Sequence, residues 1–143
     1  MKTVVYLLLS FGLLACATPR VQETSDTTQV PMLTPVVAVM ADGYRLPLTV
    51  WQPAGEPQAI VLGLHGFNDY HQAFAAPAEY LAANGVITYA YDQRGFGETE
   101  QRGIWPGADV LQQDANTMVQ LLCKRYPGIP LYLVGESMGG AVV

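Results

Sequence analysis

The chain has 143 residues, half of them apolar, and a net charge of −5. The apolar fraction supplies a sizeable core and excludes a disordered chain, and the length allows one domain or part of one. The seven Lys and Arg residues are scattered rather than clustered, which argues against a nucleic-acid partner.

The N-terminus has the pattern of an export signal. Lys2 precedes an apolar run over residues 4–14 that is shorter than the roughly 20 residues needed to span a bilayer. The run ends in Leu13-Leu14-Ala15-Cys16, which resembles the lipobox of bacterial lipoproteins. The resemblance implies a signal peptide over 1–15, lipidation at Cys16 and a place in the bacterial cell envelope, facing the periplasm or in the outer membrane. An ordinary secretory signal with an incidental cysteine is the alternative.

Residues 16–35 carry the expected lipidated cysteine and a stretch rich in Thr, Pro, Gln and Ser. This stretch has no hydrophobic period, so we expect a flexible tether outside the fold. Fully extended, it would reach roughly 60 Å.

Residues 36–143 have the pattern of an α/β domain. Two strand-like runs over 36–40 and 44–51 flank Asp42-Gly43, which predicts a hairpin, and Pro47 predicts an edge strand. Three apolar strands then alternate with two amphipathic helices, the strands over 59–64, 86–91 and 131–134, and the helices over 74–84 and 107–126. Apolar strands alternating with such helices predict a mostly parallel sheet with helices on both faces and an antiparallel hairpin added to it.

The cysteines and histidines indicate neither a disulfide nor a metal site. With Cys16 assigned to lipidation, Cys123 is left alone on the predicted helix 107–126, where we expect it to be a buried structural thiol. His65 and His71 have no Cys or carboxylate partners at zinc-ligand spacing.

The sequence Gly135-Glu136-Ser137-Met138-Gly139 fits the pattern Gly-x-Ser-x-Gly between the last strand and a helix start. Such a turn holds the serine in a strained conformation with its hydroxyl exposed, and Gly135 and Gly139 allow strand and helix to cross closely. The helix N-terminus offers free N–H groups to a developing oxyanion. The alternatives are a glycine-rich turn without chemistry and a phosphate-binding turn.

Three stretches occur together: Leu64-His65-Gly66-Phe67, Asp92-Gln93-Arg94-Gly95-Phe96-Gly97 and Gly135-Glu136-Ser137-Met138-Gly139-Gly140. Together they resemble the α/β-hydrolase fold, and within it the monoacylglycerol lipase and lysophospholipase branch, also called the serine aminopeptidase-like group. The resemblance covers residues 36–143 and implies the N-terminal half of that fold.

The family implies roles for the matching positions. Ser137 matches the nucleophile, and the backbone N–H groups of Phe67 and Met138 match the two donors of the oxyanion hole. His65 matches a residue that shapes its loop rather than the catalytic base. Asp92 and Arg94 resemble a loop-bracing pair, and we expect Asp69 and His71 on the loop surface.

The family's catalytic triad runs Ser, then Asp or Glu, then His along the chain, and only six residues follow Ser137. We therefore expect this chain to be the N-terminal part of a hydrolase, and the 143 residues alone to be inactive and poorly soluble.

The resemblance implies a membrane-anchored serine ester hydrolase acting on monoacylglycerols or lysophospholipids, with no cofactor. Two alternatives stay open. One is a non-catalytic envelope lipoprotein with this fold, and the other is the same fold cleaving a peptide or thioester bond.

Overall fold

The computed structural model describes residues 20–25 and 28–143. The predicted signal peptide over 1–15 and the predicted lipidation at Cys16 lie outside the described residues. Within the two described ranges, no helix combines the length and the apolar character that crossing a bilayer requires.

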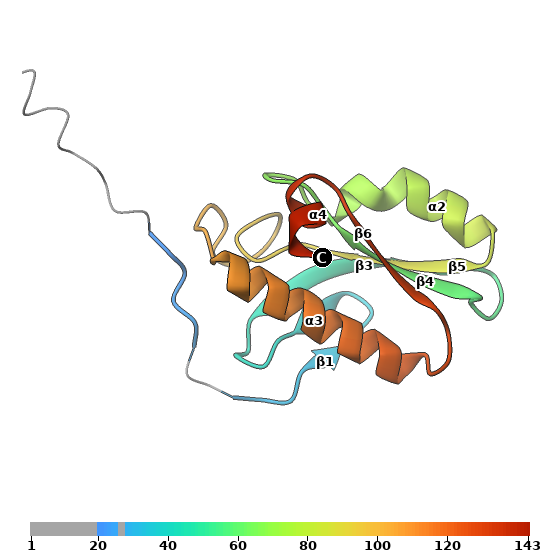
Figure 1. Ribbon diagram of the computed structural model, residues 1–143, viewed down its shortest axis with the longest axis horizontal. Coiled ribbons are helices and arrows are strands. Elements are labelled where there is room, and N and C mark those ends of the chain that lie inside the picture. Colours follow the sequence, from blue (N-terminus) through green and yellow to red (C-terminus); the bar gives the residue numbers. More distant parts are fainter. Residues whose placement is uncertain (1–19, 26–27) are drawn as a thin grey trace, which may run out of the picture.

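In the described part of the chain, six strands form one sheet (Figure 1). In chain order they are β1 (Met32–Leu33), β2 (Val37–Val39), β3 (Arg45–Trp51), β4 (Ala59–Leu64), β5 (Val86–Tyr91) and β6 (Leu131–Gly135). In space the order is β1-β2-β3-β5-β4-β6, so β4 lies between the two strands that follow it in sequence.

Strand direction follows the predicted pattern. β4 pairs parallel with both β5 and β6. β3 is antiparallel to β5 and β2 is antiparallel to β3, so β2 runs in the same direction as β4, β5 and β6. The predicted mostly parallel sheet with an antiparallel N-terminal hairpin is therefore confirmed.

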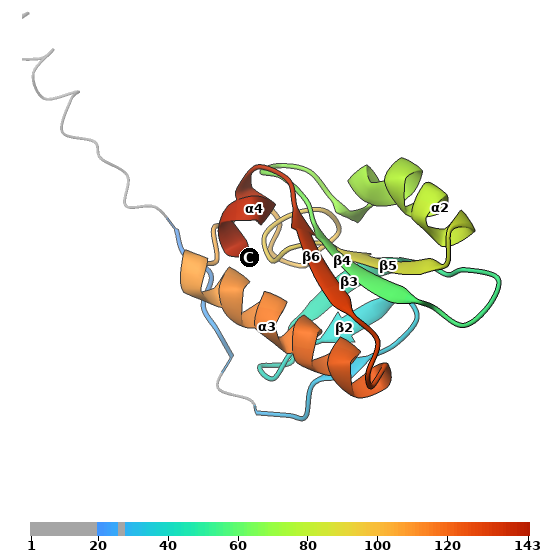
Figure 2. The ribbon, with the colours of Figure 1, turned by 45° about the vertical axis from the view of Figure 1, so that its right-hand side comes forward.

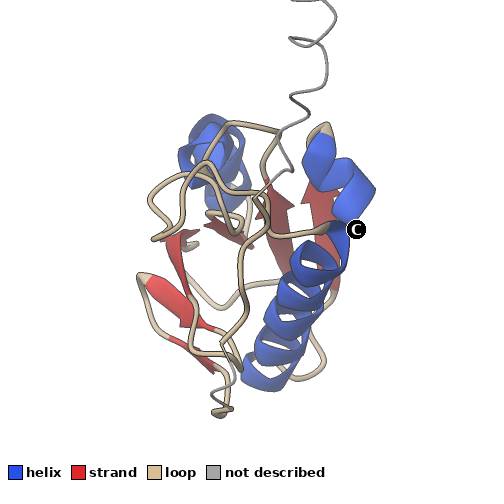
Figure 3. Cartoon of the chain, turned by 90° about the vertical axis from the view of Figure 1, so that its left-hand side faces the viewer, coloured by secondary structure: helices blue, strands red, loops and turns tan. Residues whose placement is uncertain are grey.

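Helices lie on both faces of the sheet. The 3-10 helix η2 (His71–Phe74) leads into α2 (Ala75–Ala83), and the later helices are α3 (Ala108–Arg125) and α4 (Met138–Val142). Figures 2 and 3 show α2 on one face and α3 with α4 on the other. The predicted apolar face of α3 is buried: Ala115, Met118 and Leu122 belong to the core shared with the sheet, and Leu111 is buried as well.

The hairpin between β2 and β3 is confirmed, but the edge position predicted from Pro47 is wrong. β3 lies inside the sheet, where residues 45–47 pair with β2 and residues 48–51 pair with β5. Pro47 stands at the change of partner, and its carbonyl accepts a hydrogen bond from the Asp92 N–H at 2.8 Å. The Leu48 N–H, on the opposite side of β3, donates to the Val36 carbonyl.

The tether predicted over 16–35 also needs correction for its described part. Met32–Leu33 forms β1 and pairs with β2, with Met32 opposite Val39. Earlier in the chain, Val21 forms a parallel bridge with Trp105, and the Gln22 side chain is buried. The sequence did not predict these contacts of Val21 and Gln22, because they are hydrogen bonds of the backbone and of one polar side chain and leave no hydrophobic pattern.

Two burial predictions differ from the structure. Cys123 is exposed, because it lies one position past Leu122 and so points away from the buried face of α3. The strand predicted to be fully buried, β6, leaves Tyr132 57% and Val134 46% exposed. β6 has β4 on one side and is the last strand of the described sheet.

Candidate active site

Ser137 stands at the C-terminal end of β6, in a conformation that few non-glycine residues adopt. Its φ is 48° and its ψ is −111°, and the residue is exposed. The turn around it is closed by hydrogen bonds from the Gly139 N–H to the Glu136 carbonyl at 2.8 Å and from the Gly140 N–H to the Ser137 carbonyl at 3.0 Å. A positive φ at a β-carbon-bearing residue stores strain that the surrounding structure must impose.

The strand and helix on either side of Ser137 cross with no room for a side chain. A Cβ on Gly135 would collide with the backbone of Gly139 and with the Gly140 nitrogen. A Cβ on Gly139 would collide with the Leu64 carbonyl of the neighbouring strand, β4. The close crossing expected from the glycine spacing is confirmed, and it joins the serine turn to the end of β4.

The loop after β4 lies beside the serine. A Cβ on Gly66 would be 3.7 Å from the Ser137 Cβ and 3.7 Å from the Glu136 carbonyl oxygen. The chain then turns at Asn68, where φ is 60°, and the Asp69 N–H donates to the Gly66 carbonyl at 3.3 Å. Phe67 lies within this turn. The structure therefore places Phe67 and Met138 at the same edge of the sheet.

Two N–H groups near the serine have no acceptor in the described part of the chain. The Phe67 N–H donates to no described backbone or side-chain acceptor. Met138 is the first residue of α4, where an N–H has no partner within the helix. Both groups are therefore free to bind an oxyanion.

His65 uses both of its ring nitrogens within the protein. Nδ1 lies 2.7 Å from the Gly66 carbonyl and donates to it, while Nε2 accepts a hydrogen bond from the Gln93 N–H at 2.9 Å. The Gln93 side-chain amide donates to the His65 carbonyl at 2.6 Å. Burial lowers the pKa of His65, which favours this neutral ring. As expected, His65 shapes the loop, and it has no free nitrogen with which to serve Ser137.

Asp92 holds two segments together at the end of β5. Its carboxylate accepts hydrogen bonds from the His71 N–H at 2.8 Å, from His71 Nδ1 at 2.7 Å and from the Glu98 N–H at 2.7 Å. Burial acts to raise the pKa of Asp92, but the His71 side chain and these N–H groups together hold it below its usual value. The prediction that His71 lies on the loop surface is wrong. His71 is buried because its backbone N–H and its ring donate hydrogen bonds to the Asp92 carboxylate.

Arg94 is buried and does not pair with Asp92. The two residues stabilise the loop separately, each through its own partners, and not as the predicted pair. Its guanidinium donates to both carboxylate oxygens of Asp114 on α3 at 2.9 Å, and to the Asp42 carboxylate at the hairpin turn at 2.5 and 3.2 Å. It also lies over the Tyr44 ring at 4.0 Å from the centroid. The loop after β5 is thereby tied to α3 and to the hairpin.

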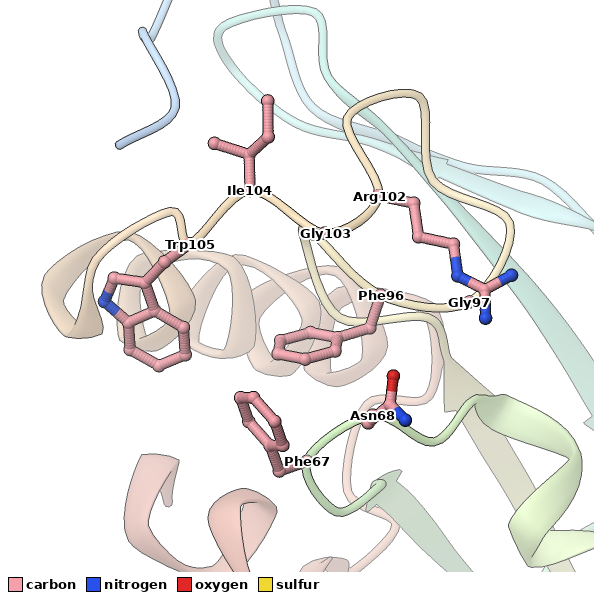
Figure 4. Close-up of a pocket in the computed structure, with 9 residues that line it drawn as sticks. Phe67, Asn68, Phe96, Gly97, Arg102, Gly103, Ile104 and Trp105 are labelled. Carbon is pink, nitrogen blue, oxygen red and sulfur yellow. The ribbon is translucent and has the colours of Figure 1, made fainter. Parts of the chain in front are cut away.

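A cavity of about 150 Å³ opens beside Phe67 (Figure 4). Its aromatic wall consists of Phe67, Phe96 and Trp105, with Phe67 and Phe96 centroids 5.3 Å apart and Phe96 and Trp105 centroids 6.4 Å apart. Sequence reasoning missed Trp105 because it lies in a loop without hydrophobic period. In residues 20–25 and 28–143, His, Cys, Asp and Glu form no group of three suited to a metal ion.

The strand order, the helices on both faces and the strained serine turn at the end of β6 define an α/β-hydrolase. The sequence profile of the family described as "Serine aminopeptidase, S33" matches residues 55–143. The chain belongs to this family.

Several relatives are monoglyceride lipases. Human monoglyceride lipase is 33% identical over 105 residues, 73% of this chain and 35% of that protein. The monoacylglycerol lipase of Mycolicibacterium smegmatis is 28% identical over 102 residues, 71% of this chain and 36% of that protein. A soluble variant of the Saccharomyces cerevisiae monoglyceride lipase, solved with a substrate analogue, superposes with a TM-score of 0.61 at 28% identity, covering 87% of this chain and 41% of that one. The chain thus spans about a third of the length of these curated relatives.

Proposed function

We propose that the whole protein is a serine ester hydrolase acting on monoacylglycerol-like or lysophospholipid esters. The observation that carries the proposal is the backbone of Ser137, a non-glycine residue with φ of 48°, exposed at a strand end and packed beside Gly66. Such strain persists only where the surroundings impose it, and it is concentrated at functional sites. The names of the relatives support a lipid ester as substrate.

The proposed reaction is acyl transfer. The Ser137 oxygen attacks the ester carbonyl carbon while its proton passes to a histidine base, and the carbonyl oxygen becomes an oxyanion held by the Phe67 and Met138 N–H groups. The alcohol leaves with that proton as the acyl-serine forms. Water then attacks the acyl-serine, which releases the fatty acid and regenerates the free serine. We assign the histidine and its carboxylate partner to the rest of the whole protein, since His65 has both nitrogens engaged and His71 is buried in the brace around Asp92.

Hydrolysis by the whole protein, with and without Ser137, tests this proposal. We expect monoacylglycerols and nitrophenyl esters to be turned over, and Ser137→Ala to lower kcat by about 10⁴-fold or more. Ser25→Ala is the matched control, because Ser25 is the other serine in the described ranges and lies in the N-terminal segment. A fluorophosphonate should label the wild type and Ser25→Ala but not Ser137→Ala.

Two results would overturn the proposal. If the whole protein turns over no ester and takes no label, it is a non-catalytic relative of the family. If it cleaves aminoacyl nitroanilides and leaves monoacylglycerols intact, the bond cleaved is a peptide bond, in keeping with the family's description.

We also propose that Cys16 carries the lipid that anchors the protein in the bacterial cell envelope. The support is the Leu13-Leu14-Ala15-Cys16 sequence after an apolar run. When bacteria that express the protein are grown with radioactive palmitate, the wild type and Cys123→Ser should become labelled, but Cys16→Ser should not. Label that persists in Cys16→Ser would contradict the anchor.

A further inference from the structure

The loop from Gln93 to Pro106 forms one wall of the cavity and has little regular structure to hold it. Gly95, Phe96, Gly97, Arg102, Gly103, Ile104 and Trp105 from this loop line the cavity. Within the loop, the Gly103 N–H donates to the Gly95 carbonyl at 2.8 Å and the Ile104 N–H donates to the Gln101 carbonyl at 3.2 Å. These contacts leave the Ile104 and Trp105 carbonyls unused, and the Gln101 carbonyl can accept a second hydrogen bond.

Gln22, which lies far away in sequence, binds those carbonyl groups. Its side-chain Nε2 donates to the Gln101 carbonyl at 3.1 Å and to the Ile104 carbonyl at 2.9 Å, and its backbone N–H donates to the Trp105 carbonyl at 3.0 Å. Gln22 is only 7% exposed. Its Oε1 has no hydrogen-bond partner among the described residues, so the side chain acts here as a donor alone.

The backbone that Gln22 holds carries Trp105, one of the three residues of the aromatic wall. The Trp105 ring packs edge-on against Phe96, and Phe96 packs edge-on against Phe67, the residue whose N–H is a proposed oxyanion donor. Figure 4 shows the three rings gathered at the cavity, with Ile104 and Gly103 on the loop above them. A shift of the 101–105 backbone would therefore change the shape of the cavity next to the serine turn.

We propose that Gln22 is a positioning residue that sets how well the cavity binds the acyl chain of the substrate. The inference rests on the proposed function, and it adds a contribution from the segment N-terminal to the sheet. Gln22 does not touch the reacting atoms. Its loss should weaken the binding of long acyl chains and leave the acyl transfer itself unchanged, because the serine turn is held separately by the glycine crossing.

The kinetic test compares two substrates that differ only in acyl length. In the whole protein, we expect Gln22→Glu to raise KM for p-nitrophenyl decanoate about tenfold, because it replaces two N–H donors with an oxygen facing two carbonyls. The kcat for this ester and both constants for p-nitrophenyl acetate should stay within about twofold. Gln29→Glu is the matched control, since Gln29 lies in the same segment and contacts the hairpin turn at Met40 and Ala41.

A second measurement needs no enzymatic activity. Trypsin cuts after arginine, and Arg102 is exposed within the held loop. Gln22→Glu should increase the rate of cleavage after Arg102 several-fold at constant protease, whereas Gln29→Glu should not.

The outcomes separate the inference from the proposed function. Unchanged cleavage and unchanged KM would overturn the inference. Faster cleavage with equal losses on the decanoate and acetate esters would also overturn it, since Gln22 would then support the fold in general. If the wild type hydrolyses no ester, the proposed function fails, while faster cleavage in Gln22→Glu would still support the part of the inference that concerns the loop.

Discussion

Two neighbouring segments at the same edge of the sheet are held in opposite ways. The serine turn, residues 135–140, depends on the absence of side chains, since Gly135 and Gly139 meet backbone at distances that exclude a Cβ. The brace loop, residues 92–99, depends on buried charged side chains, since Asp92 binds His71 and an N–H within the loop, and Arg94 binds carboxylates of α3 and the hairpin turn. The first arrangement is steric and the second is electrostatic.

This difference has a consequence for how each segment tolerates change. A steric crossing has no titratable group, so its stability does not depend on pH, and the smallest added group disrupts it. The buried ionic brace also excludes a Cβ, at Gly97 beside the Asp92 carboxylate, and it is in addition sensitive to losing a partner or a proton. We therefore expect acid to weaken the brace loop before it affects the glycine contacts of the serine turn.

The largest effect should come from adding one methyl group to the crossing. Gly139→Ala places a Cβ against the Leu64 and His65 carbonyls, which are backbone atoms of β4 and its loop and cannot rotate away. We expect a loss of about 4 kcal/mol in the free energy of unfolding, or failure to fold. Denaturant titration of the whole protein measures it. Gly55→Ala is the control, with nothing within 4 Å of the added Cβ, and equal losses in both variants would break the comparison.

Removing the cation of the brace should have the next largest effect. Arg94→Met leaves the Asp114 carboxylate, which is 4% exposed, without its cation, and also removes the ion pair with Asp42. We expect a loss of about 3 kcal/mol in the free energy of unfolding. The exposed Arg125→Met serves as control and should change this energy by less than about 0.5 kcal/mol.

The brace loop should also respond to acid. The folded-state pKa of Asp92 lies below its ordinary value, so its stabilisation is complete above an unfolded pKa of about 3.9 and is lost as pH falls through the folded pKa. Asp92→Asn should cost about 2 kcal/mol at pH 7, and its difference from the wild type should shrink as pH falls from 5 towards 2. Unfolding titrations across this range measure the difference. A constant difference would contradict the electrostatic account, and exposed Asp109→Asn is the control.

The smallest effect concerns the strain at the serine. Ser137→Gly removes the Cβ from a residue with φ of 48°, whereas Ser137→Ala keeps it. We expect the glycine variant to be about 1 kcal/mol more stable than the alanine variant, because glycine adopts positive φ at little cost. Thermal unfolding of the two variants measures the difference. A less stable glycine variant would show that the turn is unstrained.

The sequence was sufficient to predict the strands with a hydrophobic pattern and the close crossing of β6 and α4. β4 and β5 fall on the predicted residues, and the close approach at Gly135 and Gly139 followed from their spacing around Ser137. Such features depend on local periodicity or on a backbone conformation that few residues allow.

The parts that escaped prediction depend on single polar side chains with distant partners. Gln22 binds carbonyl groups 79 and 82 positions away, and His71 is buried because it serves Asp92, 21 positions along the chain. A lone Gln or His in a polar stretch carries no pattern that distinguishes an exposed side chain from a docked one. The edge position predicted from Pro47 was wrong because Pro47 lies where β3 changes its partner strand from β2 to β5. The sequence of β3 alone does not show this change.

The bridge between Val21 and Trp105 limits how far the cavity can stand from the proposed lipid anchor. Val21 is five positions after Cys16, and five such steps extend over at most roughly 18 Å, compared with the roughly 60 Å available had the chain been free as far as Pro35. With the proposed lipid on Cys16, this connection would be too short for the domain to move far from the membrane. Its cavity would stay within reach of the bilayer surface, where monoacylglycerols and lysophospholipids collect, and the local supply of substrate would depend on lateral diffusion in the membrane.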